Sequence, residues 1–247
     1  MPAEVPGRYL VAHLDGRDVA AIGWAPEEQD GRSPSWSTYI ATDNVDHTTI
    51  AVLEAGGDVL VPAADIGDAG RMAVLADPTG AVFCLWQAVD FPGAVAVNEP
   101  GTWNWSILHS RNPLVSVAFY GAVFGWQASD PGNDEPAMVR LPGYGDHLAA
   151  LDPTLRARHA EAGIPPGFSD AVAWVAPLVD DTGPRPAYSH WSVVFAVADA
   201  VASAARVEQL GGTVLEPPVA QGPVVQAVVA DPQGAPFTLS AYTPDQE

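Results

Sequence analysis

Two histidines are the residues of this sequence best suited to acid–base chemistry. His109 ends an apolar, strand-like run at 102–109, and His190 stands at the start of another run, two residues before Ser192. Because imidazole titrates near neutral pH, His109 and His190 are the candidate catalytic residues for proton transfer. A nearby serine does not by itself make a Ser-His-Asp triad, and the Gly-x-Ser-x-Gly elbow of hydrolases is missing. The competing interpretation, two satisfied or surface histidines at strand ends, stays open.

Cofactor chemistry has no support in the sequence. There is no Gly-x-Gly-x-x-Gly and no Walker A motif, so flavin, nicotinamide and nucleotide binding are not indicated. All basic residues are arginines, so no lysine can form a Schiff base with pyridoxal phosphate or with a carbonyl substrate. We therefore expect a protein without cofactors.

The composition restricts the partners and the compartment. With 30 acidic and 10 basic residues the net charge is −20, which repels phosphate backbones and excludes nucleic acid as a partner. No apolar run approaches the roughly 20 residues that a membrane helix needs, and residues 1–7 lack the features of an export signal. The single cysteine, Cys84, cannot form an intrachain disulfide, which fits a reducing compartment. We expect a cytoplasmic protein that does not bind membranes.

A repeated hairpin organises the elements that must position the histidines. The stretch AVLADPTGAVFCLW at 73–86 returns as AVVADPQGAPFTLS at 227–240. Asp-Pro-x-Gly favours a tight turn because proline presets φ and glycine tolerates positive φ. The runs that follow each turn have strand character. Each copy is therefore predicted to be a β-hairpin.

The elements before each hairpin are repeated too. A strand, a helix and a Gly-Gly pair precede the first hairpin at 36–57 and the second at 191–212. Asp43 and Asp199 are expected to cap the two helices. The same order in both halves predicts internal duplication of a βαβββ unit and an α+β fold.

The repeats also suggest how the chain is divided. We expect a first domain at 1–90, a linker at 91–101 and a second domain at 102–247 that carries an insertion at 152–188. In the second domain, 137–141 and 147–151 are expected to pair as a hairpin like the one at 9–24. The insertion has no counterpart in the first half and opens with a short helix near 155–162. Loops of this length are usually lids, binding loops or disordered insertions.

The segment FYGAVFGW at 119–126, followed by the strand–helix–Gly-Gly order and the Asp-Pro-x-Gly hairpins, resembles the vicinal oxygen chelate superfamily. That superfamily includes glyoxalase I, extradiol dioxygenases and bleomycin-resistance proteins, and the chain looks most like its tandem glyoxalase-like proteins of actinobacteria. The resemblance covers nearly the whole chain. It implies an α+β fold of paired βαβββ modules whose curved sheets enclose a ligand cavity, with the helices outside.

A tandem protein of this type has four modules, and this chain is expected to begin inside the first one. Counterparts of the strand and helix at 102–124 are missing before Tyr9. The first sheet should then have an open edge, which proteins normally cover. Either a second copy in a homodimer or the 152–188 insertion is expected to cover it. An incomplete gene start is the alternative.

The resemblance also indicates where a metal would be held. Members that bind a divalent ion use His, Gln or Glu at the start of each module and Glu near its end. The matching positions here are Ser37, Trp105 and Ser192 at the starts, and Cys84 and Thr238 at the two clear ends. The remaining ends, near Gly23 and Ala150, offer no carboxylate either. A hard divalent ion needs several oxygen or imidazole ligands, so we expect no metal.

Strand alternation from these positions predicts what lines the cavity instead. Residues two apart on a strand share a face. The expected ligand-binding residues of the second half are Trp103, Trp105, Ile107, Ser192, Thr238, Ser240 and Tyr242, beside the catalytic candidates His109 and His190. In the first half, Tyr39, Val82 and Trp86 are expected to share a face with Ser37 and Cys84. Apolar walls with a few polar groups suit a hydrophobic or aromatic ligand. Alternatively, the two tryptophans of the second half only fill a shrunken core.

Three functions fit this pattern. The preferred one is a metal-independent enzyme of small-molecule metabolism, with secondary metabolism as one setting, that performs isomerase-, cyclase- or lyase-type proton transfer on a hydrophobic or aromatic metabolite. The second is a non-catalytic protein that sequesters such a compound, as the bleomycin-resistance branch does. The third is a scaffold with a closed cavity. One fold hosts many functions, so the resemblance alone does not choose among them.

Overall fold

The computed structural model describes residues 9–23, 34–128, 135–161, 163–165, 167–178 and 188–243. A hairpin of β1 (Tyr9–Leu14) and β2 (Arg17–Gly23) precedes three βαβββ modules. Module I consists of β3 (Tyr39–Ala41), α1 (Val45–Glu54), β4 (Asp58–Ile66), β5 (Gly70–Ala76) and β6 (Val82–Ala88). Module II consists of β7 (Trp103–Ser110), α2 (Pro113–Phe124), β8 (Gln127–Ala128), β9 (Ala137–Arg140) and β10 (Ala171–Pro177). Module III consists of β11 (His190–Ala196), α5 (Ala200–Gln209), β12 (Thr213–Gln221), β13 (Val224–Ala230) and β14 (Pro236–Tyr242).

The Asp-Pro-x-Gly motifs form the tight turns expected of them. In module I, the carboxylate of Asp77 accepts hydrogen bonds from the backbone N–H groups of Thr79 and Ala81, at 2.8 and 3.0 Å. In module III, Asp231 accepts the equivalent bonds from Gln233 and Ala235, both at 2.9 Å. The aspartate thus ties each turn internally, which explains why both copies carry the motif.

The Gly-Gly pairs end α1 and α5 for two different reasons. The first glycine of each pair has a positive φ, 88° at Gly56 and 87° at Gly211, which closes the helix. The second packs against a strand, since a Cβ at Gly57 would lie 2.7 Å from the carbonyl oxygen of Ala76. At the N-termini, Asp199 caps α5 as expected, whereas α1 is capped by Asn44 and not by Asp43.

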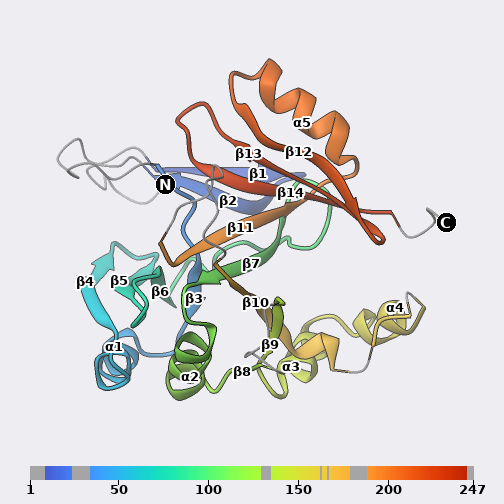
Figure 1. Ribbon diagram of the computed structural model, residues 1–247. Helices are drawn as coiled ribbons and strands as arrows, with labels where there is room; N and C mark the ends of the chain where they lie inside the picture. The colour runs from blue at the N-terminus through green and yellow to red at the C-terminus, as the bar shows by residue number, and fades with distance from the viewer. Residues whose placement is uncertain are drawn as a thin grey trace.

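Two sheets carry the three modules (Figure 1). Modules II and III form an eight-stranded sheet in the order β12-β13-β14-β11-β7-β10-β9-β8, joined by the antiparallel pair β7–β11. Module I forms a four-stranded sheet in the order β3-β6-β5-β4. In every module the first strand runs parallel to the last, as in β3–β6, β7–β10 and β11–β14. The paired-module α+β architecture that the sequence predicted is therefore confirmed.

The prediction for residues 137–151 was wrong in its second half. Residues 137–140 form β9, but α3 (Tyr144–Leu151) is a helix that starts after Gly143, so 147–151 is not a strand. Eight residues of mixed apolar and polar character do not separate the helical period from the strand period. The helix expected near 155–162 is present as α4 (Leu155–Glu161).

The 152–188 insertion contains an element that the sequence analysis missed. Its residues 171–177 form β10, which pairs in parallel with β7 and antiparallel with β9. The described part of the insertion therefore joins the eight-stranded sheet and does not cover the edge of module I. That edge is β3, which has β6 as its single neighbour among the strands of the described residues.

The helices cover one face of each sheet, and the main core lies beneath them. α1 and α2 lie next to each other at the bottom of Figure 1, and the residues around them form a core that includes Phe83, Leu85 and Trp191. α5 covers a second, smaller core around Val229 and Leu239. The strand residues Phe83, Leu85, Trp191 and Leu239, which belong to these two cores, are all buried. Among the described residues, no helix combines the length and apolarity that crossing a membrane requires.

Candidate functional site

The candidate site lies on the face of the eight-stranded sheet opposite α2 and α5, which we call the front face. Alternation assigns residues to it. Leu108 and Trp191 point into the core beside α2, so their neighbours Ile107, His109, His190 and Ser192 point to the front. On β14, Leu239 packs under α5, which places Thr238 and Ser240 on the front face.

The structure brings both catalytic candidates together with the predicted serine. His109 and His190 are directly opposite each other on β7 and β11, and their rings stack with centroids 4.9 Å apart. His109 Nε2 lies 3.0 Å from Ser192 Oγ, within hydrogen-bonding distance. His109 is 9% exposed, whereas Ser192 is partly accessible. An imidazole and a hydroxyl at this distance can pass a proton between them.

The hydrogen bond of His190 fixes its tautomer. Its Nδ1 lies 2.8 Å from the carbonyl oxygen of Tyr188, and because a carbonyl only accepts, Nδ1 carries the proton. The stack also limits the charge of the pair. Two imidazolium rings 4.9 Å apart would repel each other by about 3 kcal/mol at an effective dielectric constant of about 20. The arrangement therefore favours at least one neutral imidazole, the form that acts as a base.

Next to this cluster lies a group of aromatic side chains, two of which the sequence analysis did not identify. Trp105, one of the predicted ligand-binding residues, makes edge-to-face contacts with Phe168, at 5.7 Å, and with Trp174, at 6.5 Å. Trp174 belongs to the missed strand β10. Phe168 belongs to the short 3-10 helix η1 (Phe168–Asp170), which precedes β10. The apolar run 171–175 was the available signal, but it lay inside a segment without repeat counterpart.

The turn that carries Phe168 is anchored over the sheet. The backbone N–H of Leu141, just after β9, donates to the carbonyl of Asp170 at 2.8 Å. Ser169 Oγ lies 2.9 Å from His159 Nδ1 of α4. The insertion therefore reaches the front face through η1, where Phe168 packs on Trp105.

Trp103 was assigned to the wrong face. A β-bulge at Asn104 makes Phe195 the partner of Trp103, whereas Val194 pairs with Trp105. The indole of Trp103 donates to Ser106 Oγ at 3.3 Å, and Ser106 alternates with Trp105, so it points to the back. An extra residue in one strand reverses the alternation beyond it. The position of this bulge depends on the partner strand, which the local pattern does not reveal.

The remaining predicted residues lie on the front face at increasing distance from the histidines. The register aligns Ser192 with Ile107 and Trp174 in one row, and Thr238 with Val194 and Trp105 in the next. Ser240 and Tyr242 occupy two further rows, each about 7 Å along the strands. Tyr242 is 63% exposed and lies too far away to share a small ligand with His109.

The register also corrects the metal-ligand positions that the family resemblance implies. In module I, Ser37 lies two residues before Tyr39, the pairing partner of Cys84. In module III, Ser192 lies two residues before Val194, the partner of Thr238. The same spacing in module II relates Trp105 to Trp174, because Ile107 pairs with Trp174. The end of module II is therefore Trp174 and not a residue near Ala150, which lies in α3.

The chemistry of these side chains does not fit a divalent metal. Two indoles, three hydroxyl or thiol groups and one exposed serine replace the expected imidazoles and carboxylates. Within the described ranges, no three His, Cys, Asp or Glu side chains are grouped so that they could hold a metal ion. No step of a mechanism is therefore assigned to a metal.

The corresponding face of module I is less suited to chemistry. Tyr39 pairs with Cys84 across β3 and β6, and its ring contacts Trp86 edge to face at 6.5 Å, as alternation predicted. Burial raises the pKa of the Cys84 thiol to about 11, so it stays protonated near neutral pH. Cys84 is 4% exposed and acts as a small buried group.

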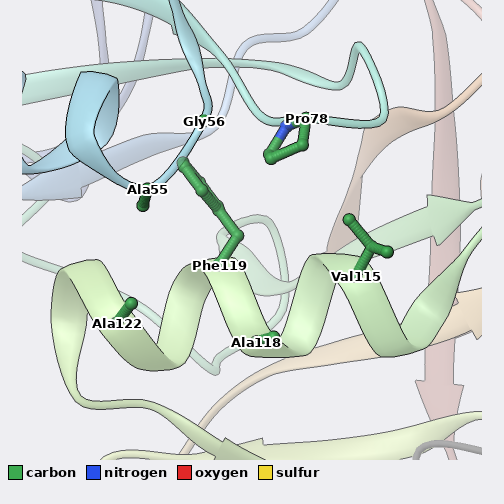
Figure 2. Close-up of a pocket in the computed structure, with 7 residues that line it drawn as sticks. All are labelled: Ala55, Gly56, Pro78, Val115, Ala118, Phe119 and Ala122. Carbon is green, nitrogen blue, oxygen red and sulfur yellow. The ribbon is translucent and has the colours of Figure 1, made fainter.

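Two grooves lie away from the front face. The first, of about 320 Å³, runs between the end of α1 and α2 and is shown in Figure 2. Phe119 and Val115 project into it from α2 toward Gly56 and Pro78, and its lining has no acid–base group. The second, of about 510 Å³, lies where β3 and β6 meet the end of α2. Neither includes a predicted residue of the second-half site, and the second is lined by Trp86, which was expected on the cavity face of the first half.

The family model of the glyoxalase-like domain matches residues 105–240, which cover nearly all of modules II and III. Among curated proteins, "Putative glyoxylase CFP32" of Mycobacterium tuberculosis is 40% identical over 242 residues, covering 97% of this chain and 82% of that protein. "Anthracycline biosynthesis protein DnrV" of Streptomyces peucetius is 32% identical over 245 residues, covering 94% and 79%.

Solved structures share the fold at low sequence identity. The Mn(II)-bound glyoxalase from Novosphingobium aromaticivorans superposes with a TM-score of 0.52 at 16% identity, covering 82% of this chain and 61% of that one. A variant of homoprotocatechuate 2,3-dioxygenase from B. fuscum gives a TM-score of 0.52 at 12% identity, covering 97% and 66%. Both support the paired-module architecture described above.

Proposed function

The chain belongs to the glyoxalase-like family of the vicinal oxygen chelate superfamily, and we propose that it is a metal-independent enzyme that transfers a proton within a hydrophobic or aromatic metabolite held on the front face. The observation that carries this proposal is the 3.0 Å contact between His109 Nε2 and Ser192 Oγ. His109 is the general base, and the Ser192 hydroxyl, which is more accessible, faces the ligand and relays the proton.

Isomerisation, cyclisation and elimination next to a carbonyl share a first step that such a pair can perform. The proton leaves the carbon beside the carbonyl, passes to Ser192 Oγ as that hydroxyl gives its own proton to His109 Nε2, and leaves an enolate on the ligand. The proton then returns to another carbon, or the enolate expels a leaving group. A positioned acid–base group contributes about 10²–10⁴-fold to such a step.

His190 positions the base. Its stacked ring fixes the plane of His109, and its own orientation is set by the carbonyl oxygen of Tyr188. The imidazole stack also disfavours double protonation, which keeps a base available near neutral pH. His190 is therefore expected to affect the rate less than His109 does.

The nature of the ligand follows from the aromatic group beside the pair. Trp174 lies in the same row as Ser192 and Trp105 lies in the next row. Together with Phe168 they offer faces and edges to a flat ring system beside Ser192. The name of the Streptomyces peucetius relative refers to anthracycline biosynthesis, which supports an aromatic polyketide as ligand and a role in secondary metabolism.

The test separates binding from turnover. Ketones of the anthracyclinone class are titrated against tryptophan fluorescence, and their conversion is followed by mass spectrometry, for the wild type, His109→Gln and Ser192→Ala. His109→Gln should keep the dissociation constant within about threefold and lose about 10²–10⁴-fold in rate. His47→Gln, on the exposed surface of α1, is the matched control and should change neither quantity.

Equal rates for the wild type and His109→Gln would refute the assignment of the base. Tight binding with recovery of unchanged ligand would instead favour the second function, a protein that sequesters an aromatic compound. The fluorescence and mass measurements on the same samples distinguish these outcomes.

A further inference from the structure

Arg140 is the last residue of β9 and lies on the front face. Its neighbour Val139 is buried in the core beside α2, so the side chain of Arg140 points to the opposite side. Met138, two residues earlier on the same face, pairs with Trp174, which places Arg140 about one row away, level with Trp105. The arginine therefore stands at the border of the aromatic group.

The guanidinium of Arg140 has an unmet hydrogen-bonding requirement. Its Nε is shielded from solvent and has no hydrogen-bond partner among the described residues. The arginines of the neighbouring helix behave differently, since Arg156 pairs with Asp146 and Arg158 pairs with Asp152. Arg140 forms no ion pair with a described residue, although the chain has 30 acidic residues. Burying an unpaired charge or donor is unfavourable, so an acceptor from outside the chain would be bound strongly there.

The η1 turn links this cation to the aromatic group. A Cβ on Gly167 would lie 3.9 Å from Arg140 Nε, and the next residue is Phe168, which packs on Trp105. The same short turn thus lies beside the guanidinium and contacts the ring that would hold a flat ligand. An anionic substituent at Arg140 and a ring against Trp105 would be covered by one segment of chain.

The spacing sets the size of such a ligand. From β9 to β11 there are three steps between neighbouring strands, about 14 Å in all. Arg140 also lies one row along the strands from Ser192, so the Cα atoms of the two residues are about 16 Å apart. A ligand that contacts both side chains therefore needs an extended body, such as two or three fused six-membered rings with an anionic substituent.

We propose that Arg140 binds a carboxylate of the ligand, so that the front face selects aromatic carboxylic acids. A carboxylate matches the guanidinium because Nε and one Nη can donate two parallel hydrogen bonds to its two oxygens. This inference rests on the proposed function only in placing the ligand on the front face, and it does not depend on proton transfer.

The test compares two probes that differ in charge and hardly in shape, anthraquinone-2-carboxylate and anthraquinone-2-carboxamide. Their dissociation constants are measured by quenching of tryptophan fluorescence at 0.15 M salt, for the wild type, Arg140→Met and Arg140→Lys. The wild type should bind the carboxylate at least about tenfold more tightly than the carboxamide. Arg140→Met should lose about 10–100-fold for the carboxylate and less than about twofold for the carboxamide, because an ionic hydrogen-bonded pair is lost only with the anion.

Two controls keep the result specific. Arg158→Gln removes a positive charge from α4 of the insertion, and it should change neither constant by more than about twofold. Arg140→Lys keeps the charge without the planar fork and should restore part of the preference for the carboxylate. The thermal unfolding temperature of Arg140→Met should be no lower than that of the wild type, because an unpaired cation is replaced by an apolar side chain of similar length.

The outcomes separate this inference from the proposed function. If the wild type binds both probes equally, or Arg140→Met binds the carboxylate as the wild type does, Arg140 does not recognise the anion, whereas the proposed proton transfer remains tenable. If neither probe binds, the inference fails together with the aromatic ligand. If binding is as predicted but His109→Gln converts a ketone substrate as fast as the wild type, only the catalytic assignment fails.

Discussion

Asp77 offers a prediction whose size can be worked out from the structure. Its side chain is 1% exposed and lies where the β5–β6 turn of module I meets α2 of module II. It accepts hydrogen bonds from the N–H groups of Thr79 and Ala81, from Thr79 Oγ1 at 2.7 Å and from Ser116 Oγ at 3.3 Å. Asp77 also interacts electrostatically with the buried Tyr120, whose hydroxyl accepts a hydrogen bond from the Trp191 indole at 2.8 Å. Asp77 is thus connected to β11, next to His190.

The change Asp77→Ala removes every one of these acceptor interactions. Ala81 is fully buried, so its N–H loses its partner without access to water, which costs about 1–3 kcal/mol. Thr79 is partly buried and can recover some hydration, and Ser116 keeps its 2.8 Å bond to Ser110. Adding the disrupted contact to Tyr120, we expect the free energy of unfolding to fall by about 3–5 kcal/mol.

The repeat supplies the control. Asp231→Ala removes the equivalent turn bonds from module III, including the bond from the N–H of the buried Ala235. Gln233 is exposed and no helix residue bonds to Asp231 in the described part of the chain, so about 1–3 kcal/mol should be lost. Urea unfolding followed by tryptophan fluorescence measures both variants. Equal losses within about 0.5 kcal/mol would show that the bonds from Asp77 to α2 do not stabilise the contact between modules I and II.

Three further predictions address the Cys84 thiol, the η1 turn and the β3 edge of module I. Folding raises the pKa of the Cys84 thiol from 9.0 to about 11, so the unfolded thiol ionises at a lower pH than the folded one. The free energy of unfolding should therefore fall by up to about 2–3 kcal/mol between pH 9 and 11. Urea titrations at each pH would measure this fall, which should be smaller in Cys84→Ala. Phe168→Ala removes the edge contact to Trp105 and should weaken binding of anthraquinone-2-carboxylate about 3–10-fold; an unchanged constant would mean that η1 does not cover the ligand. Light scattering should find a homodimer in which the β3 strands of two copies pair, as β7 and β11 pair within the chain. The N–H of Ala41 points away from β6 and can bond to the second copy, so Ala41→Pro should give a monomer. A monomeric wild type would refute this arrangement.

The sequence predicted those parts of the fold that local chemistry determines. Asp-Pro-x-Gly and Gly-Gly specify turns and helix ends within a few residues, so both hairpins and α5 were predicted at the positions where the structure has them. Alternation then placed His109, His190 and Ser192 on one face, because β7 and β11 are regular over that stretch. The unit boundaries at 1–90 and 102–247 stay a prediction.

The parts that sequence reasoning missed depend on contacts between distant segments. The apolar run of β10 is compatible with a buried helix as well as with a strand. It forms a strand because it pairs with β7 in the folded protein. The bulge at Asn104 exists only against β11, so the reversal of Trp103 had no local signal. Trp174 and Phe168 reach Trp105 only once the insertion has folded onto the sheet.

The most direct test of the central claim is the exchange of ligand hydrogen with solvent. An anthracyclinone ketone is incubated with the protein in D₂O, and the deuterium at the carbon beside the carbonyl is measured by mass spectrometry against time. Proton removal by the His109–Ser192 pair predicts that the wild type and His47→Gln exchange this hydrogen about 10²–10⁴-fold faster than His109→Gln at equal occupancy of the site. If a ketone that binds to the front face exchanges no faster with the wild type than with His109→Gln, the pair is not the base, and the account of catalysis on this face is wrong.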